Sequence, residues 1–280
     1  MEQFGRVLKL NSLKSGDVWR QVDVLIFNTG LWWHRTGIKQ LARVANSFGA
    51  AQKVNEVHGG VGRRRVVVVS AVLSGWGWGS VALCWLLRRE DGMEGVGATL
   101  GEGRLAEAVR VAMWDYVEDD GIILEDMDRM VAFKKALMTW AKWVESDVNS
   151  FKTKVFFRGI SPAHYKGVEW NERGARNCSK EIRPLEGSTY PSGVPIEANV
   201  VKDIMSNNIS SSKSVHLLDI TILSQLRKDG HPSTYNGAGR MDCTHWCVAG
   251  VPDIWNQLLY AQLLQQDMED GFDYFTPKYL

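Results

Sequence analysis

The chain lacks an excess of charge of either sign, and it lacks an apolar N-terminal segment. Its 33 lysine and arginine residues balance 32 acidic residues, which gives a formal net charge of +1 and no argument for nucleic-acid binding. The first twenty residues contain no apolar run of the kind that forms a secretory signal or a membrane anchor. A chain of 280 residues is nevertheless long enough to bury a sizeable core in one or two domains.

Cysteine is scarce and tryptophan is abundant. The sequence has four cysteines and twelve tryptophans. Indole rings stack on the apolar faces of sugars, but they fill hydrophobic cores more often. The tryptophan content is therefore compatible with glycan binding without predicting it.

A motif near the C-terminus gives the strongest indication of chemistry. Asp242 and His245 stand three residues apart in the string MDCTHWC at residues 241–247. An Asp placed one turn before a His accepts the imidazole N–H, sets its tautomer and leaves the other ring nitrogen to take a proton from a nucleophilic hydroxyl. The pair is thus the acid–base half of a serine-type hydrolase or acyltransferase site. No serine in the sequence is an obvious partner for it.

Further segments accompany this motif in a defined order. They are DVLIFNTG at 23–30 with tryptophans at 32–33, DMDRM at 126–130, WAKW at 140–143, VFFR at 155–158 with SPAH at 161–164, WN at 170–171, NC at 177–178, LDI at 218–220, and PDIWN at 252–256 with LLY at 258–260. Together these segments resemble the plant trichome birefringence-like (PC-esterase) family of polysaccharide O-acetyltransferases. The resemblance covers roughly residues 17–40 and 114–270.

This resemblance implies an α/β fold of the SGNH/GDSL-hydrolase type, with a parallel sheet flanked by helices. It implies acetyl transfer to a plant cell-wall polysaccharide, most often xylan, with Asp242 and His245 as catalytic residues. The donor would be acetyl-CoA or an acetylated intermediate, and the family needs no bound cofactor and no metal. Family members face the Golgi lumen behind an N-terminal membrane anchor, which we expect this chain to lack.

The Gly-Asp-Ser nucleophile block of the family does not occur in these residues. The nearest match is SGDV at residues 15–18, where valine replaces the serine. Ser74 and Ser80 lie in Gly/Trp-rich sequence without a strand–turn–helix context, so both are poor nucleophile candidates. We therefore expect an N-terminally truncated core that is inactive by itself. The alternatives are a non-catalytic glycan-binding or non-functional fragment, and a polysaccharide acetylesterase.

Residues 41–113 carry none of the family segments, and twelve of the 27 glycines fall within residues 49–103. We interpret this stretch as an atypical insert, for example a translated intron. It would separate a remnant of the N-terminal half of the core, residues 1–40, from the C-terminal part of the catalytic domain, residues 114–280. Residues 66–87 are free of charge and long enough to span a membrane, but their serines and glycines and their place inside the core disfavour a span.

Two apolar runs predict buried parallel strands, at residues 22–27 and 154–158. Functional groups of such sheets follow the C-terminal ends of strands. We therefore expect Arg158, Ser161 and His164 to face the active cleft. The family resemblance makes Asn28 the oxyanion-hole candidate, while a side chain bonded to its own turn is the alternative.

Other patterns predict the scaffold. A 3-4-3-4 spacing of apolar residues predicts a helix at 126–146, with Asp126 and Asp128 in its first turn. Residues 215–220 predict a strand, 224–228 a helix, and 229–233 a turn that orders the approach to the Asp–His motif. A terminal helix begins near Pro252 and is expected to pack Ile254, Leu258 and Ala261 against the core.

The cysteines have two interpretations. The resemblance implies a disulfide between Cys178 and Cys243, and a partner for Cys247 that is missing from this chain. The alternative is a zinc site of Cys178, Cys243, His245 and Cys247, which the crowded C-x-H-x-C spacing disfavours. A metal site that combines His164 with the Asp–His pair is disfavoured as well, because the spacing matches no particular metal.

Overall fold

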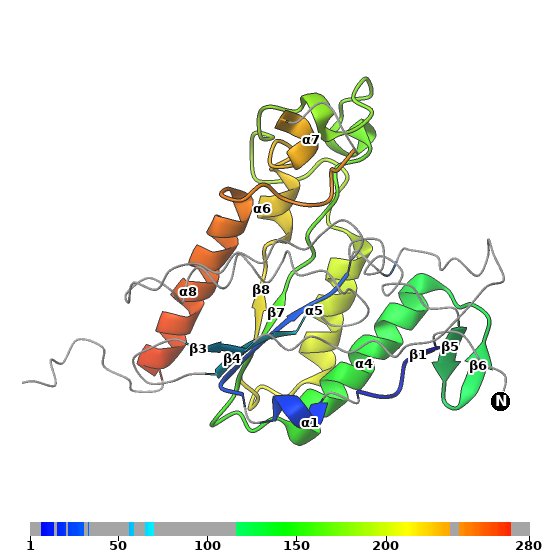
Figure 1. The fold of residues 1–280 in the computed structure, drawn as a ribbon, viewed down its shortest axis with the longest axis vertical. Helices are drawn as coiled ribbons and strands as arrows, with labels where there is room; N and C mark the ends of the chain where they lie inside the picture. Colours follow the sequence, from blue (N-terminus) through cyan, green and yellow to red (C-terminus); the bar gives the residue numbers. More distant parts are fainter. Residues whose placement is uncertain are drawn as a thin grey trace, which may run out of the picture. The chain divides into compact units, whose positions relative to one another are not determined.

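The computed structural model describes residues 7–13, 16–20, 22–30, 33, 56–58, 65–69, 116–235 and 241–269. The chain divides into two compact units, and the elements of each can be followed in Figure 1. The first unit comprises residues 1–80, 90–162 and 193–221, and the second comprises residues 81–89, 163–192 and 222–280.

A five-stranded sheet lies at the centre of the first unit, with the order β3-β4-β2-β7-β8. Its strands are β2 (Val24–Asn28), β3 (Glu56–His58), β4 (Arg65–Val69), β7 (Lys154–Arg158) and β8 (Val215–Leu218). Neighbouring strands run parallel except for the pair β3 and β4. The predicted α/β fold with a parallel sheet is confirmed.

The central strands are apolar because both of their faces are covered. Leu25 and Phe27 of β2 belong to the main core cluster, whereas Ile26 points to the opposite face, and none of the three is more than 1% exposed. Strand β7 covers the predicted residues 154–158, and β8 ends two residues earlier than predicted.

Two helices, α4 (Arg129–Asp147) and α5 (Ile196–Asn208), pack against each other and against the sheet (Figure 1). Helix α4 buries the predicted stripe, including Phe133, Leu137 and Trp140. Its start differs from the prediction: Asp128 is the N-cap, and its side chain accepts the backbone N–H groups of Met130 and Val131. Neither Asp126 nor Asp128 therefore lies in the first turn, because the cap precedes the helix.

A three-stranded sheet escaped the sequence analysis. It consists of β1 (Val7–Lys9), β5 (Tyr116–Asp119) and β6 (Ile122–Leu124), in the order β1-β5-β6. A two-residue turn joins β5 to β6, with Asp120 at φ 49° and Gly121 at φ 84°. An Asp-Gly pair is a strong signal for such a hairpin, so the sequence did carry the information. A short helix, α1 (Gly16–Trp19), lies between β1 and β2.

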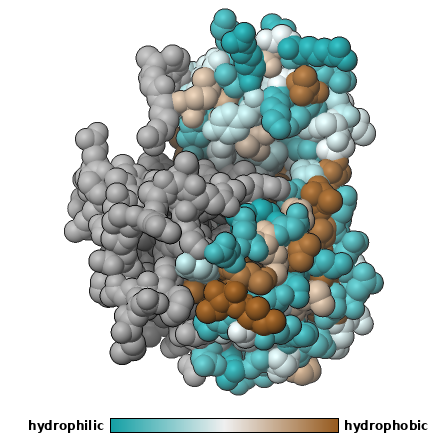
Figure 2. Space-filling view, turned by 90° about the vertical axis from the view of Figure 1, so that its right-hand side faces the viewer, coloured by the Kyte–Doolittle hydropathy of each residue, from teal (hydrophilic) through white to brown (hydrophobic). Residues whose placement is uncertain are grey.

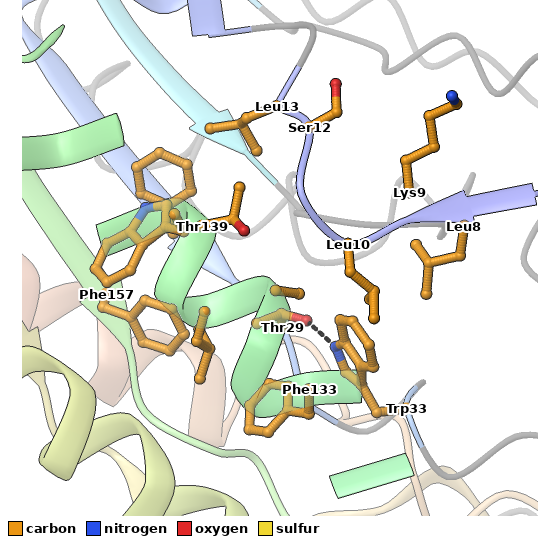
Figure 3. Close-up of a pocket in the computed structure, with 14 residues that line it drawn as sticks. Leu8, Lys9, Leu10, Ser12, Leu13, Thr29, Trp33, Phe133, Thr139 and Phe157 are labelled. Carbon is orange, nitrogen blue, oxygen red and sulfur yellow. Dashed lines mark hydrogen bonds between the residues drawn. The ribbon is translucent and has the colours of Figure 1, made fainter. Parts of the chain in front are cut away.

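A small cavity of about 50 Å³ lies in the first unit, beside β1 and the middle of α4. Figure 3 shows its lining, which is mainly apolar and includes Leu10, Phe133 and Trp33. The indole N–H of Trp33 donates to the hydroxyl of Thr29 at 2.8 Å. Because the cavity offers few polar groups to a substrate, we assign it to core packing.

Part of the segment interpreted as an insert contributes to the sheet. Strands β3 and β4 come from it, and β4 pairs in parallel with β2. A membrane-spanning helix at 66–87 is incompatible with this strand. The rest of the segment, with Ser74, Ser80 and Cys84, lies outside the described residues, and its origin stays a prediction. In the described part of the chain, no helix combines the length and apolarity needed to cross a membrane.

Short elements and one long helix form the second unit. They are η3 (Gly167–Trp170), η4 (Cys178–Lys180), α7 (Pro232–Tyr235) and α8 (Val251–Glu269), together with all but the first residue of α6 (Thr221–Gln225). Helix α6 begins and ends three residues before the predicted helix. A disulfide joins Cys178 to Cys243, the pairing that the resemblance implies.

Helix α8 turns a different face to the core than predicted. Val251, Trp255 and Leu259 are buried, whereas Ile254 and Leu258 are 38% and 39% exposed. Ala261 is exposed too. Both stripes are apolar at helical spacing, so the packing of the second unit decides between them.

Hydrophobic residues also gather in patches on the face of the molecule shown in Figure 2.

Candidate active site

Asp242 and His245 form the pair that their spacing predicts. Nδ1 of His245 lies 2.7 Å from Oδ2 of Asp242. The other carboxylate oxygen accepts the backbone N–H groups of His245 and Thr244, at 2.9 and 3.1 Å. The His245 side chain is 45% exposed, and its Nε2 makes no hydrogen bond to any residue that the structure describes. The ring is therefore oriented by its inner nitrogen and presents the outer one to a reactant.

Electrostatics keep Asp242 ionised. Burial by itself would raise the pKa of this carboxyl group. The backbone N–H groups of His245 and Thr244 and the His245 ring outweigh that effect, so the pKa lies below the ordinary aspartate value. At neutral pH the carboxylate can therefore accept the ring N–H and stabilise an imidazolium at His245.

The loop at 229–233 and the disulfide support this turn. The Ser233 hydroxyl accepts the backbone N–H of Asp242 at 2.5 Å, and the N–H of Ser233 donates to the Asp242 carbonyl at 3.3 Å. The N–H of Cys247 donates to the Gly230 carbonyl at 2.9 Å. The predicted turn thus bonds to the motif, but its last two residues, Pro232 and Ser233, already belong to α7, and Cys243 ties the motif to η4.

A second group of candidates lies at the C-terminal ends of β2 and β7, within the first unit. Asn28 pairs in register with Arg158, and Nη2 of Arg158 donates to Oδ1 of Asn28 at 2.6 Å. Burial lowers the pKa of Arg158 to about 10, so the guanidinium stays charged at neutral pH. Asn28 thus uses its carbonyl oxygen to accept a hydrogen bond from Arg158. Ser161 follows on the same segment and is half-buried.

His164 needs correction, because it does not face a cleft. Its side chain is 0% exposed, and its two ring nitrogens contact His231 and the Gln225 carbonyl. His231 was not predicted as a functional residue, because the string DGHPS at 229–233 indicates only a turn. A histidine inside a turn that precedes the motif was the signal that could have found it.

The zinc interpretation of the cysteines fails on the disulfide. Cys178 and Cys243 are oxidised, and a disulfide cannot supply the thiolates that a zinc site requires. Cys247 is a free cysteine, and burial raises the pKa of its thiol. Within the residues that the structure describes, no group of three or more His, Cys, Asp or Glu side chains is arranged to hold a metal.

A comparison with known protein families identifies the class of protein. Residues 105–262 match the PC-Esterase family, a GDSL/SGNH-like acyl-esterase family found in Pmr5 and Cas1p. Asp242 and His245 lie inside the matched segment, as do β7, β8 and α4. The fold and the site together therefore define an α/β protein of the acyl-esterase class.

Similar proteins from Arabidopsis thaliana identify the family to which the chain belongs. The chain is 39% identical to Protein trichome birefringence-like 38 over 263 residues, which cover 94% of this chain and 49% of the relative. It is 37% identical to Protein trichome birefringence-like 41 over 267 residues, which cover 94% of this chain and 54% of the relative. The chain belongs to the trichome birefringence-like family of acyl-transfer and esterase enzymes, as predicted, and it spans about half the length of these relatives.

Proposed function

We propose that the chain carries the acid–base half of an O-acetyltransferase that modifies a plant cell-wall polysaccharide, with xylan as the foremost acceptor. One observation carries the proposal. Asp242 holds Nδ1 of a half-exposed His245, so Nε2 is the nitrogen that can take a proton from a hydroxyl group.

The reaction is a double displacement on a serine. His245 takes the proton of the serine hydroxyl through Nε2 while the serine oxygen attacks the acetyl carbonyl, and Asp242 stabilises the imidazolium that forms. His245 then returns this proton to the leaving group of the donor, for example the thiolate of CoA. A sugar hydroxyl next attacks the acetyl-serine, again losing its proton to Nε2, and the released serine oxygen regains a proton from His245.

We assign Asn28 to the stabilisation of the oxyanion. Arg158 engages Oδ1 of Asn28, so the side-chain amide keeps its two N–H donors for another acceptor. Donors of this kind act when they are fixed before the charge develops on the acetyl oxygen. Arg158, which holds Asn28, and Ser161, which follows on the same segment, are the other residues that we propose for this group.

The serine is the part of the mechanism that these residues do not supply, because no Gly-Asp-Ser string occurs among them. We therefore propose that the 280-residue chain alone does not transfer acetyl groups. Hydrolysis of acetylated polysaccharide is the second candidate function. It uses the same pair with water as acceptor, and the half-exposed His245 ring is accessible to water.

The disulfide supports a location in the secretory pathway for this function. A cross-link between Cys178 and Cys243 persists in the oxidising lumen of the secretory pathway and is rare in the cytosol. We propose that the whole protein acts in the Golgi lumen, anchored to the membrane through a segment outside these residues. Acetyl-CoA or an acetylated intermediate serves as donor, and no further cofactor, metal or nucleic acid takes part.

Mass spectrometry of xylan oligosaccharides incubated with an acetyl donor tests the proposal. The experiment compares the 280-residue chain with a fusion that adds the family's Gly-Asp-Ser segment to its N-terminus. We expect no acetyl transfer by the chain alone, transfer by the fusion, and loss of transfer in the fusion with His245→Ala. Transfer by the chain alone would refute its inactivity. A folded fusion that is inactive, or that tolerates His245→Ala, contradicts the assigned mechanism, and faster release of free acetate than transfer favours the esterase.

A further inference from the structure

Two buried histidine rings contact each other and the backbone of the catalytic turn. His164 and His231 are both 0% exposed, and Nδ1 of His164 lies 2.7 Å from Nε2 of His231. Each outer nitrogen meets a backbone carbonyl oxygen. Nε2 of His164 lies 2.9 Å from the carbonyl oxygen of Gln225, and Nδ1 of His231 lies 2.7 Å from the carbonyl oxygen of His245. This series of contacts therefore ends on the proposed catalytic base.

The three contacts in this series determine how many protons the two rings must carry. A carbonyl oxygen only accepts, so both outer nitrogens must carry a proton. The inner contact joins two ring nitrogens, and one of them must also carry a proton. Three contacts thus require three protons, whereas two neutral imidazoles carry two. All three contacts are hydrogen bonds only when the pair holds one extra proton and one positive charge.

Aromatic rings surround the pair. The Trp246 ring centroid lies 4.3 Å from that of His231, with the planes 34° apart. Trp170 and Tyr190 lie 5.6 and 6.1 Å from the His164 ring. The face of an aromatic ring attracts a cation within about 6 Å, so Trp246, whose ring is stacked on that of His231, replaces part of the hydration that burial removes.

The surroundings oppose a second extra proton. The pKa of His164 is lowered to about 4, mainly by burial and also by the charges of His231 and Lys228, although the carbonyl of Gln225 and the carboxylate of Asp229 oppose this shift. A fourth proton would also place two N–H groups face to face at 2.7 Å. The pair therefore takes up a single extra proton.

His231 is the ring of the pair that contacts the catalytic turn, and its surroundings act on its pKa in both directions. Burial lowers the pKa of His231, while the carbonyl group of His245 and the carboxylates of Asp242 and Asp229 oppose this shift. Uptake consequently takes place on acidification, below the ordinary histidine range. A metal ion does not replace the proton, because two bonds of about 2.0–2.1 Å to zinc would hold the nitrogens further apart than they are.

We propose that His164 and His231 form a shared-proton dyad that positions His245. The inference rests on the proposed function, because that function makes His245 the catalytic base. What the dyad itself determines is the position of His245. In the neutral dyad one of the three contacts lacks a proton. In the neutral dyad His231 donates to the His245 carbonyl only in the arrangements that leave another contact without a proton, whereas in the singly protonated dyad it donates there while the N–H···N bond is kept. Protonation therefore holds the backbone of the catalytic turn more firmly.

Ring-nitrogen NMR of the nitrogen-15-histidine-labelled 280-residue chain tests the dyad without any substrate. The pH is lowered from about 8, above the ordinary histidine pKa of about 6.5, to about 4, well below it, as far as the chain stays folded. We expect the rings of His164 and His231 to change together, in one step that adds one proton. A shared N–H···N proton appears in the same step. The Nδ1–H of His245, which donates to Asp242, then exchanges more slowly with water.

Variants assign the signals and test the positioning. His164→Gln and His231→Gln each abolish the shared proton. His231→Gln also speeds exchange of the His245 Nδ1–H about fivefold, the factor expected for one lost hydrogen bond. The matched control is His216→Gln, which replaces a half-buried histidine of β8 and leaves this exchange unchanged.

Three outcomes would overturn the dyad. They are separate titration of the two rings, no proton uptake by either ring before unfolding, and His245 exchange that responds equally to His231→Gln and His216→Gln. If a glutamine variant fails to fold, the titration of the unsubstituted chain decides alone. These readouts need no acetyl transfer, so an inactive chain contradicts only the proposed function.

Discussion

Asp242 uses its two carboxylate oxygens for two tasks. Oδ1 accepts the backbone N–H groups that close the turn, and Oδ2 accepts the ring N–H of His245. Both tasks need an acceptor, and only a carboxylate offers one at each position. The spacing of three residues is what allows one side chain to perform both.

Asp242→Asn separates these tasks. The amide oxygen can keep the turn, but the NH₂ group cannot accept the His245 Nδ1–H, so the ring adopts the wrong tautomer. We expect acetyl transfer by the Gly-Asp-Ser fusion to fall about 10⁴-fold, the loss that the same change causes in a serine protease triad. Transfer rates by mass spectrometry measure the effect. Asp203→Asn, at an exposed position of α5, serves as the control and leaves the rate unchanged. Equal rates in the two variants would contradict the assignment of Asp242.

The lowered pKa of Asp242 predicts a pH-dependent contribution to stability. A carboxylate whose pKa is lower in the folded state stabilises folding above its unfolded pKa, about 3.9 for aspartate, and loses this effect as the pH falls through the folded value. Urea unfolding should therefore show the full difference between the unsubstituted chain and Asp242→Asn at neutral pH. The difference should shrink in acid. A difference that grows as the pH falls would mean that the folded-state pKa is raised.

Single elements position the candidate groups through close contacts. The parallel pairing of β2 with β7 places Asn28 beside Arg158 at the end where functional groups of such sheets gather. In the second unit, the N–H of Gly167 donates to the Ala175 carbonyl at 3.0 Å, which holds η3 against the loop that follows it. This approach leaves no room for a side chain at residue 167.

Gly167→Ala tests the packing of η3. A Cβ atom there would lie 2.1 Å from the Ala175 carbonyl oxygen and 2.2 Å from that of Glu172, so the backbone must shift. We expect a loss of about 1–3 kcal/mol in the free energy of unfolding, typical of overpacking. Urea unfolding followed by tryptophan fluorescence measures it. Gly174→Ala is the matched control, because a Cβ there meets nothing within 4 Å, and it should change stability by less than about 0.5 kcal/mol. Equal effects of the two changes would show that the contact at Gly167 is unimportant.

At the scale of the whole molecule, one covalent bond joins distant parts of the chain. The disulfide connects Cys178 to Cys243 across a sequence separation of 65 residues, with a Cα–Cα distance of 5.7 Å. The loop that it closes contains the His164 partner His231, together with the segment leading to Asp242. The fold around the catalytic turn therefore depends on an oxidising environment.

Removal of this disulfide should destabilise the chain strongly. The double variant Cys178→Ala with Cys243→Ala is expected to lose roughly 2–5 kcal/mol, because the unfolded chain gains freedom in a long loop. Thermal unfolding with and without reductant measures the effect, and reductant should change the unsubstituted chain but not the double variant. Cys247→Ala, which removes the free cysteine, should stay sensitive to reductant. The prediction would be contradicted if the midpoint temperature of unfolding were the same with and without reductant in all three proteins.

Sequence patterns predicted the elements that are long or uniformly apolar. The run at 154–158 coincides with β7, and the apolar stripe of residues 126–146 is buried in α4. The hairpin of β5 and β6 was missed although its Asp-Gly turn signals it, and β1 was missed because it has only three residues and pairs through Val7 with the distant Tyr116. Short strands of this kind are stabilised by their partners rather than by their own composition.

The sequence by itself determined the Asp242–His245 pair and, through the family segments, the family. A separation of three residues brings carboxylate and imidazole together whatever the rest of the chain does. Only the tertiary structure decided that α8 buries Trp255 rather than Ile254, and that His164 pairs with His231 instead of facing a cleft. Those outcomes depend on contacts between segments far apart in the sequence, which no local spacing specifies. The Asp–His pair is local, whereas the histidines proposed to position it are brought together by folding.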